Sequence, residues 1–210
     1  MKKLKLILFA SIGIVALTAS CSDEFLDKKP LGQISGSTIN DAAGVEGKLI
    51  AAYRTLSGQG MNGGGTWYYD IHGWIFGSIA SDNAVKGTDA GDQPEHSFIE
   101  AYDFTTFNVH IRDKWRSVYW GMARANEVID AVAEAAEGDD PVDSARAAVI
   151  IAEARFLRGF HALQAQLHFR NPAYVDDTAY DVNDVESSKV PNSGPIWDSI
   201  IADFTAAASV

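Results

Sequence analysis

The sequence of 210 residues predicts an all-α fold. Apolar residues recur at three- and four-residue spacing in several separate segments, which is the periodicity of amphipathic helices. Stretches that carry Gly, Asp and Pro lie between these segments, and such stretches break helices. No run alternates between apolar and polar residues for long, and the closest one, 104–109, is short. We therefore expect helices packed on helices, without a sheet.

The first predicted helix begins after Asn40 or Asp41, because either residue can cap a helix N-terminus. A glycine-rich loop follows its apolar stripe, which consists of Val45, Leu49, Ala52, Tyr53 and Leu56. A second helical segment, 69–80, is apolar almost all round, which predicts burial on several sides. The segment 85–96 carries Gly, Asp and Pro and is predicted to be a loop.

Two long helices, 115–135 and 144–169, predict an antiparallel hairpin, with Pro141 as a hard stop between them. The stripe of the first contains Trp115, Tyr119, Met122, Asn126, Ile129 and Val132 or Ala133. The stripe of the second contains Val149, Glu153, Phe156, Phe160, Leu163 and Leu167. We expect Phe156 and Phe160 to be buried between the helices. Small residues, including Gly121 and Gly159, should let the two backbones approach closely.

A polar stretch, 176–193, leads to a last amphipathic helix. Its apolar side consists of Ile196, Trp197, Ile200, Ile201, Phe204 and Ala207. Stacked hairpins of this kind form tetratricopeptide-like architectures, although no repeat of about 34 residues occurs in the chain. The residues therefore predict an all-α fold with a helical hairpin, without proving a stack of such hairpins.

The N-terminus has the pattern of a secretion signal. Three lysines, at 2, 3 and 5, precede an apolar run, 6–17. This run is too short to cross a membrane, but its length suits the core of a signal peptide. Cys21 follows it and is the only cysteine in the chain, so no internal disulfide can include it.

The segment 17–21 resembles a bacterial lipoprotein signal, although Leu17 stands one place earlier than in the strict pattern. The resemblance implies that residues 1–20 are a signal peptide and that Cys21 is acylated. Residues 21–36 then form a lipid-anchored tether. The acidic segment Ser22-Asp23-Glu24 is similar to the tag that directs lipoproteins of the Bacteroidetes to the cell surface.

The charge of the chain excludes one class of partner. The sequence has 17 basic and 28 acidic residues, a net charge of −11. Loss of the three N-terminal lysines with the signal leaves 14 basic residues against 28 acidic ones, a net charge of −14. No basic cluster interrupts this acidic average, so nucleic acid is not an expected partner.

Several short segments follow one another in a fixed order along the chain: Asp23-Glu24-Phe25-Leu26-Asp27 with Pro30, Ser81-Asp82-Asn83-Ala84, 115–129, 152–160 and 191–204. Together they resemble the SusD/RagB family of outer-membrane nutrient-binding lipoproteins. Their order and spacing behind a lipoprotein signal carry the resemblance, which covers nearly the whole chain.

The resemblance implies an all-α fold of tetratricopeptide-like helical hairpins with long irregular loops. It also implies a surface-exposed lipoprotein of the outer membrane. Such a protein captures oligosaccharides or other oligomeric nutrients for import with a TonB-dependent, SusC-like channel. Family members are longer, so residues 37–210 are expected to be the N-terminal part of a SusD-like helical domain, incomplete at the C-terminus. An alternative hypothesis is a helical-repeat lipoprotein scaffold that binds a protein partner.

Candidate ligand-binding residues come from two segments. Sugars bind to flat aromatic faces and to carboxylates and amides that form hydrogen bonds with hydroxyl groups. The aromatic candidates are Trp67, Tyr68 and Tyr69, for which packing beneath the adjacent loop is the alternative. The polar candidates are Asp82, Asn83, Asp89, Asp92, Gln93 and His96. The first two of these can equally cap and brace the loop.

Other polar residues are expected to be structural. Asn126 lies in an apolar stripe and is interpreted as a buried amide that sets helix register. Arg155, Arg158 and Glu153 are expected to form ion pairs inside the helix stack. His161 and His168 have no third ligand nearby in the sequence, so no metal site is predicted. No catalytic motif occurs in a suitable context, and neither a cofactor nor an enzymatic activity is expected.

Overall fold

The computed structural model describes residues 41–57, 73–180, 184, 186 and 189–210, and in these residues the fold is all-α, as predicted. The helices are α4 (Ala42–Arg54), the short turns η1 (Thr55–Ser57) and η2 (Ile75–Ile79), α6 (Pro94–Glu100), α7 (Val109–Ala136), α8 (Ser144–Phe169) and α9 (Trp197–Ala207). None of the helices in the described residues is long and apolar enough to cross a membrane. Cys21 and the predicted signal lie outside the described residues.

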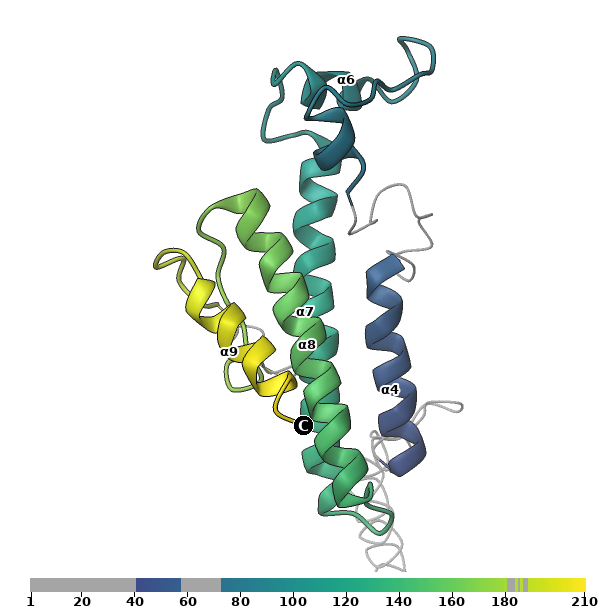
Figure 1. Ribbon diagram of the computed structural model, residues 1–210, viewed down its shortest axis with the longest axis vertical. Helices are drawn as coiled ribbons and strands as arrows, with labels where there is room; N and C mark the ends of the chain where they lie inside the picture. Colours follow the sequence, from purple (N-terminus) through teal and green to yellow (C-terminus); the bar gives the residue numbers. More distant parts are fainter. Residues whose placement is uncertain (1–40, 58–72, 181–183, 185, 187–188) are drawn as a thin grey trace, which may run out of the picture. The chain divides into compact units, whose positions relative to one another are not determined.

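The helices α7 and α8 form the predicted antiparallel hairpin (Figure 1). Contacts between them run in opposite directions along the chain, since Lys114 contacts Gln164, Gly121 faces His161 and Asn126 contacts Arg158. The caps agree with the predicted helix boundaries at the turn. Helix α7 ends at Ala136, just before the predicted break, and the Asp143 side chain accepts hydrogen bonds from the first amides of α8.

Helix α7 begins six residues earlier than predicted. Asn108 is its N-terminal cap, and its side chain accepts hydrogen bonds from the amides of His110 and Ile111. The Asn108 side-chain amide also donates to the carbonyl of Glu95, at 3.0 Å. This residue therefore joins the start of α7 to α6, an interaction that the apolar pattern of the sequence does not contain.

Close approach between α7 and α8 at Gly121 is confirmed, whereas Gly159, predicted to serve the same contact, faces α9 instead. A Cβ atom added at Gly121 would lie 2.2 Å from the ring of His161. A Cβ atom at Gly159 would lie 3.1 Å from the Cβ of Asp203, in α9. Both distances are shorter than ordinary van der Waals contact, so α7 and α9 each pack against α8 at a position that lacks a side chain.

His161 also connects α4 to the hairpin. The Thr55 hydroxyl donates to the carbonyl of Ala52, at 2.6 Å, and lies 2.7 Å from Nε2 of His161. A hydroxyl has a single proton, so Nε2 of His161 must carry the hydrogen that it shares with Thr55. The imidazole is fully buried, and burial lowers its pKa to about 3, with a smaller contribution from the charge of Lys114. It is therefore neutral at pH 7.

The buried face of α8 differs from the predicted one. Phe156 is 46% exposed and Phe160 is half-buried, so the prediction that they lie buried between the two helices is wrong. The face that packs against the core lies one position further along the helix and consists of Ile150, Ala154, Leu157, His161 and Ala165. Small side chains allow the close contact with α7, while the larger rings lie on its flank.

The segment before α6 also departs from its prediction. In the described part of 69–80, the helical turn is only η2, in which Ile75 and Ile79 are buried while Gly77 and Ser78 are exposed. Burial on several sides is therefore wrong for these residues. Further along, α6 begins at Pro94, inside the segment predicted to be a loop up to residue 96. A proline at the first position of a helix has a suitable φ angle and needs no amide partner.

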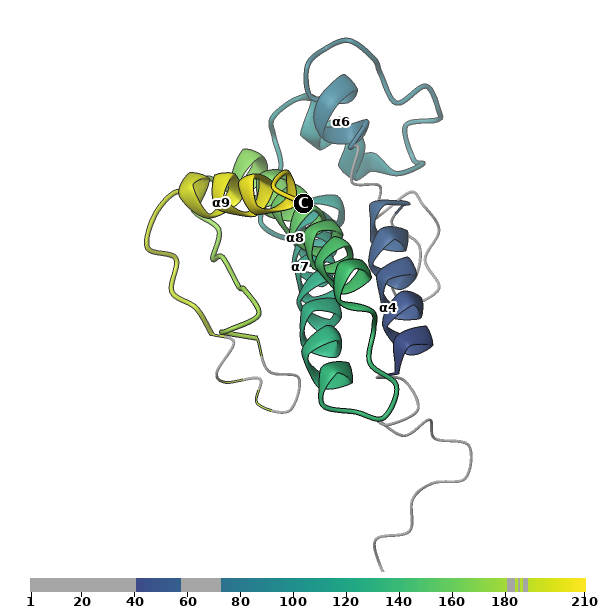
Figure 2. The ribbon, with the colours of Figure 1, turned by 60° about the horizontal axis from the view of Figure 1, so that its bottom comes forward.

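Helices α4 and α9 lie on opposite sides of the hairpin in both views (Figures 1 and 2). The main core joins α4 to the hairpin through Val45, Leu49, Val128 and Leu157 among others. A smaller cluster joins α9 to it through Met122, Ala162 and Ile200. Polar contacts reinforce α4, since Arg146 of α8 forms two hydrogen bonds with Glu46, at 2.6 and 2.7 Å.

Gly121→Ala should destabilise the protein. The added methyl group has no space beside the His161 ring, and overpacking of a core typically costs about 1–3 kcal/mol. We expect a loss of that size in the free energy of unfolding, measured by denaturant unfolding followed by circular dichroism.

Gly47→Ala is the matched control, because Gly47 lies inside α4 and a Cβ atom there meets nothing within 4 Å. This variant should be more stable than the wild type by about 0.5–1 kcal/mol, since alanine favours a helix. Equal stability of the two variants would contradict the close packing of Gly121 on His161.

Candidate functional site

Apart from His96, the polar candidate residues lie in one largely exposed segment between η2 and α6. Figure 1 shows this segment, with α6, at the end of the hairpin where α7 begins. The chain leaves η2 through a turn in which the amides of Asn83 and Ala84 both donate to the carbonyl of Ser78, at 3.0 Å. Asp82 has a left-handed backbone with φ of 59°. The segment is thus anchored at its start by backbone hydrogen bonds.

Lys86 closes the rest of the segment into a loop. Its ammonium donates to the carbonyl of Asp89, at 2.7 Å, and to the carbonyl of Asp92. The amide of Asp92 donates to the carbonyl of Asp89, at 3.0 Å. The loop therefore takes its shape from one lysine and from main-chain groups, because two of its carbonyls point at the same cation.

The carboxylates of this loop do not contribute to the hydrogen bonds that maintain its shape. Asp82, Asp89 and Asp92 are exposed, and in the described part of the chain their carboxylate oxygens accept no hydrogen bond. Asn83 differs, since its amide donates to Ser81 Oγ at 2.9 Å and so braces the turn. Gln93 occupies the cap position before α6, with φ of 48°. Asp89 and Asp92 thus share one loop through their carbonyls, while both side chains are exposed to solvent.

His96 is not part of this exposed surface. It lies in α6 rather than in a loop and is almost completely buried. Its ring stacks on that of His110, with 4.0 Å between centroids, and meets the edge of Trp74 at 5.2 Å. We therefore remove His96 from the candidate ligand contacts. Trp67, Tyr68 and Tyr69 lie outside the described residues.

The stacked histidines remain neutral near pH 7. Burial lowers the pKa of His110 to about 4, and the nearby His96 contributes in the same direction, whereas Glu95 and Asp113 oppose it. Burial and the charge of Lys86 lower the pKa of His96, against the effect of Glu95 and Asp92. Two uncharged rings can stack, so α6 and α7 are held together beneath the loop by an apolar contact.

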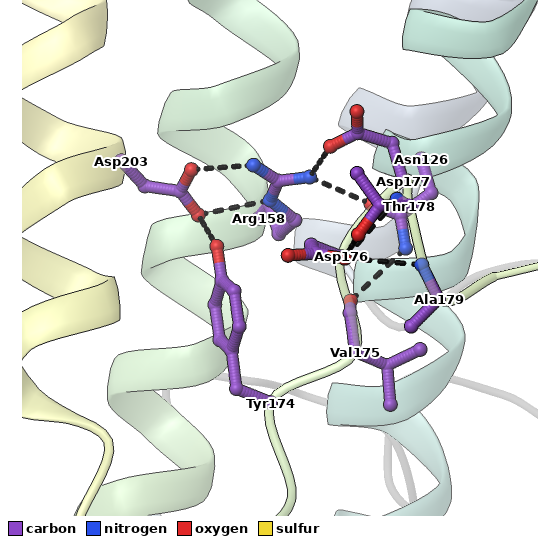
Figure 3. Close-up of polar contacts among 9 residues, drawn as sticks. All are labelled: Asn126, Arg158, Tyr174, Val175, Asp176, Asp177, Thr178, Ala179 and Asp203. Carbon is purple, nitrogen blue, oxygen red and sulfur yellow. Dashed lines mark hydrogen bonds and ion pairs between the residues drawn. The ribbon is translucent and has the colours of Figure 1, made fainter. Parts of the chain in front are cut away.

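A network of hydrogen bonds around Arg158 lies inside the helix stack (Figure 3). Arg158 forms two hydrogen bonds with Asp203 of α9, at 2.9 and 2.7 Å, and a third with Asn126 of α7, at 3.0 Å. It also pairs with Asp177. The Tyr174 hydroxyl donates to Asp203, at 2.5 Å. Burial alone would lower the pKa of Arg158, but the hydrogen bonds and charge of Asp203 raise it.

This network has the character of a structural element. The predicted roles of Asn126 and Arg158 are confirmed, since both are buried and form internal polar contacts. Glu153 does form an ion pair, with Arg146, but at a partly exposed position. Arg155 has no carboxylate within ion-pairing distance among the described residues, so its predicted ion pair is wrong there. The partners Asp177 and Asp203 were missed, because no local spacing connects them to Arg158.

An acidic hollow of about 550 Å³ lies between α4 and α7, lined in part by Glu127, Asp130 and Glu134. Burial and the charges of Asp177 and Glu134 raise the pKa of Asp130 to about 6. Glu127 already accepts hydrogen bonds from Arg124 and from the Tyr180 hydroxyl. Within the described ranges, no three His, Cys, Asp or Glu side chains come together in a way that could hold a metal ion.

An apolar groove of about 590 Å³ lies beside the exposed ring of Phe156. Val149, Phe204 and Val210 also line it. Its two polar side chains are paired with one another, since the Tyr53 hydroxyl donates to Glu153 at 2.8 Å. The groove therefore offers little hydrogen bonding to a sugar, and its chemistry suits an apolar surface instead.

Acidification should destabilise the fold through the buried histidines. Histidine in the unfolded chain titrates near pH 6.5, whereas His110 and His161 have pKa values of about 4 and about 3. At a pH between the unfolded and the folded pKa of a histidine, the unfolded chain binds more protons than the folded protein. The free energy of unfolding therefore falls as the pH falls. The loss is up to about 1.4 kcal/mol per pH unit for each histidine. Asp130, with its raised pKa, acts in the opposite direction.

Denaturant unfolding at several pH values between about 7 and 4.5 measures this dependence. His110→Gln removes one titrating group, so its stability should fall less steeply with acidification than that of the wild type. An identical slope in the two proteins would show that His110 is not held neutral in the folded state.

No family model matches the sequence, and no curated protein matches it significantly. The function is therefore inferred from the residues of the chain and from their arrangement.

Proposed function

We propose that the protein is a surface-exposed lipoprotein that binds glycans and passes them to a TonB-dependent, SusC-like channel in the outer membrane. Two features of the sequence support the proposal: the single cysteine behind a secretion signal and the ordered set of SusD/RagB-like segments. The all-α architecture is compatible with it. In this proposal the helices are the N-terminal hairpins of a tetratricopeptide-like scaffold, and the protein binds its ligand without catalysis.

The observation that carries the proposal is the loop closed by Lys86. Its shape is maintained by main-chain groups, and the carboxylates of Asp89 and Asp92 are left exposed to solvent. A carboxylate accepts hydrogen bonds from two directions at each oxygen, and sugar hydroxyl groups are suitable donors. A loop that is already ordered also loses less conformational entropy when it binds. Preorganised acceptors on a fixed loop are therefore suited to hydroxyl-rich ligands.

A protein partner is the second candidate function. The apolar groove beside Phe156 favours it, because exposed apolar patches often mark contacts with other proteins. The two functions differ in a simple measurement. Isothermal titration of the purified chain against a panel of oligosaccharides should give saturable heats if the protein binds glycans, and none if it binds a protein partner alone.

The double variant Asp89→Ala, Asp92→Ala should bind glycans more weakly than the wild type, with an unchanged melting temperature. The two carboxylates would be lost as acceptors, whereas the carbonyls that bind Lys86 belong to the main chain and remain. A loss of about 1–3 kcal/mol per charged hydrogen bond corresponds to at least tenfold weaker binding. Titration calorimetry with the oligosaccharide that binds the wild type measures the change.

Glu137→Ala, Asp139→Ala is the matched control. It removes the same charge from exposed residues at the turn between α7 and α8, remote from the loop. Its affinity should equal that of the wild type. Unchanged affinity in the variant of the loop would mean that these carboxylates do not bind glycan, and equal weakening in both variants would indicate a general effect of charge.

Cys21→Ala should release the protein from membranes. If Cys21 is the acylated residue, its loss removes the acyl chains, and each buried methylene contributes about 0.8 kcal/mol to anchoring. Fractionation of cells should then find the variant in the soluble fraction and the wild type with outer membranes. Ser22→Ala keeps the cysteine and should remain with the membranes. A Cys21→Ala protein that still sediments with outer membranes would exclude the lipid anchor.

A further inference from the structure

A third hollow lies beside the N-terminal half of α7 and is lined by aromatic rings. It has a volume of about 380 Å³ and is lined by Trp115, Tyr119, Ala173, Val175 and the segment 189–192. Trp115 is 38% exposed, although tryptophan has the largest apolar side chain. Its volume is near the lower end of the about 300–1,000 Å³ that ligand pockets occupy. The hollow therefore suits a small ring rather than a long chain.

Two neighbouring aromatic rings hold the Trp115 ring in place. It packs against Tyr119, with 4.6 Å between centroids, and meets Phe169 of α8 edge to face at 4.9 Å. The Tyr119 hydroxyl donates to the carbonyl of Ala173, at 3.0 Å, so this ring is fixed by the framework. Because these contacts already order the Trp115 side chain, it would lose little conformational entropy when a ligand binds.

The rim of the hollow supplies hydrogen-bonding groups without an unbalanced charge. Asn192 is exposed and has an amide that both donates and accepts. Lys189 is also exposed, and its ammonium pairs with the carboxylate of Glu186. Among the residues that the structure describes, no acidic side chain lines the hollow itself. An aromatic floor with a polar, electrically balanced rim differs from both the apolar groove and the acidic hollow described above.

We propose that this hollow is a second glycan subsite, in which Trp115 stacks against one neutral pyranose ring. The axial C–H groups of a pyranose present a weakly positive, apolar face, which complements the negative face of an indole. Its equatorial hydroxyl groups would meet Asn192 and the Lys189–Glu186 pair. The inference rests on the proposed function and extends it, since the subsite uses other residues than the loop closed by Lys86.

The test follows the indole N–H signal of Trp115 by NMR in the purified full chain. The probes are the methyl glycosides of glucose, galactose, mannose and N-acetylglucosamine, with that of glucuronic acid as an anionic comparison. At least one neutral glycoside should shift the signal in a saturable manner. The inference is overturned if no neutral glycoside does so, or if only the glucuronide binds.

Variants separate this subsite from other binding. Trp115→Ala should weaken binding of the responsive glycoside about tenfold or more, as judged from stacking of bases on aromatic side chains, whereas Trp115→Phe should retain part of it. Trp197→Ala is the matched control, because Trp197 is 44% exposed on α9 and does not line the hollow. Equal affinities of Trp115→Ala and the wild type would overturn the inference.

The same experiment distinguishes failure of the subsite from failure of the proposed function. The variant Asp89→Ala, Asp92→Ala should leave the shift of the Trp115 signal intact, because the hollow contains neither carboxylate. If an oligosaccharide binds the wild type and the Trp115→Ala protein equally, the subsite is excluded while the proposed function stands. If no saccharide binds the wild type, both are excluded.

Discussion

The buried guanidinium of Arg158 is the constraint on which the arrangement of the helices depends. Its side chain is only 6% exposed, and a buried cation is tolerated only when its donors are paired. The partners come from α7, from α9 and from the segment that follows α8 (Figure 3). Asn126, which accepts from Arg158, donates in turn to the carbonyl of Val175 at 3.0 Å. A shift of any of these elements by one helical turn would leave a charge unpaired, so one side chain sets the register of four segments.

The helices themselves could be predicted from the sequence because their signals are local. Asp41, one of the two predicted caps, caps α4, and α8 begins at Ser144, as predicted, behind its cap Asp143. Pro141 lies in the break between α7 and α8. The face of α8 could not be predicted in the same way. The prediction chose the stripe with Phe156 because its apolar side chains are the largest. Close contact with α7 instead requires small side chains. Leu167, which belongs to the predicted stripe, is 61% exposed. Which stripe is buried depends on the partner helix, and the spacing within one helix does not contain that information.

The sequence predicted which residues the candidate loop contains, but it did not predict the contacts that these residues make. Exposed carboxylates in a glycine-bearing loop were expected, and Asp89 and Asp92 lie in such a loop. The role of Lys86 depends on a contact between a side chain and two carbonyls, which no residue type specifies in advance. His96 was misplaced because Pro94 was interpreted as a loop residue, although it begins α6. Residues that meet only in three dimensions, such as Trp115, Phe169 and Asn192, have no common signal in the sequence.

The loop closed by Lys86 separates the groups that maintain its shape from the groups that it offers to solvent. Its shape uses one lysine and the carbonyls of Asp89 and Asp92, which every amino acid possesses. The side chains at positions 89 and 92 can therefore change without a cost in folding. During evolution such a loop can acquire amide, hydroxyl or aromatic groups at these two positions, one mutation at a time. Related proteins could thus diverge in what they recognise while the scaffold beneath the loop stays the same.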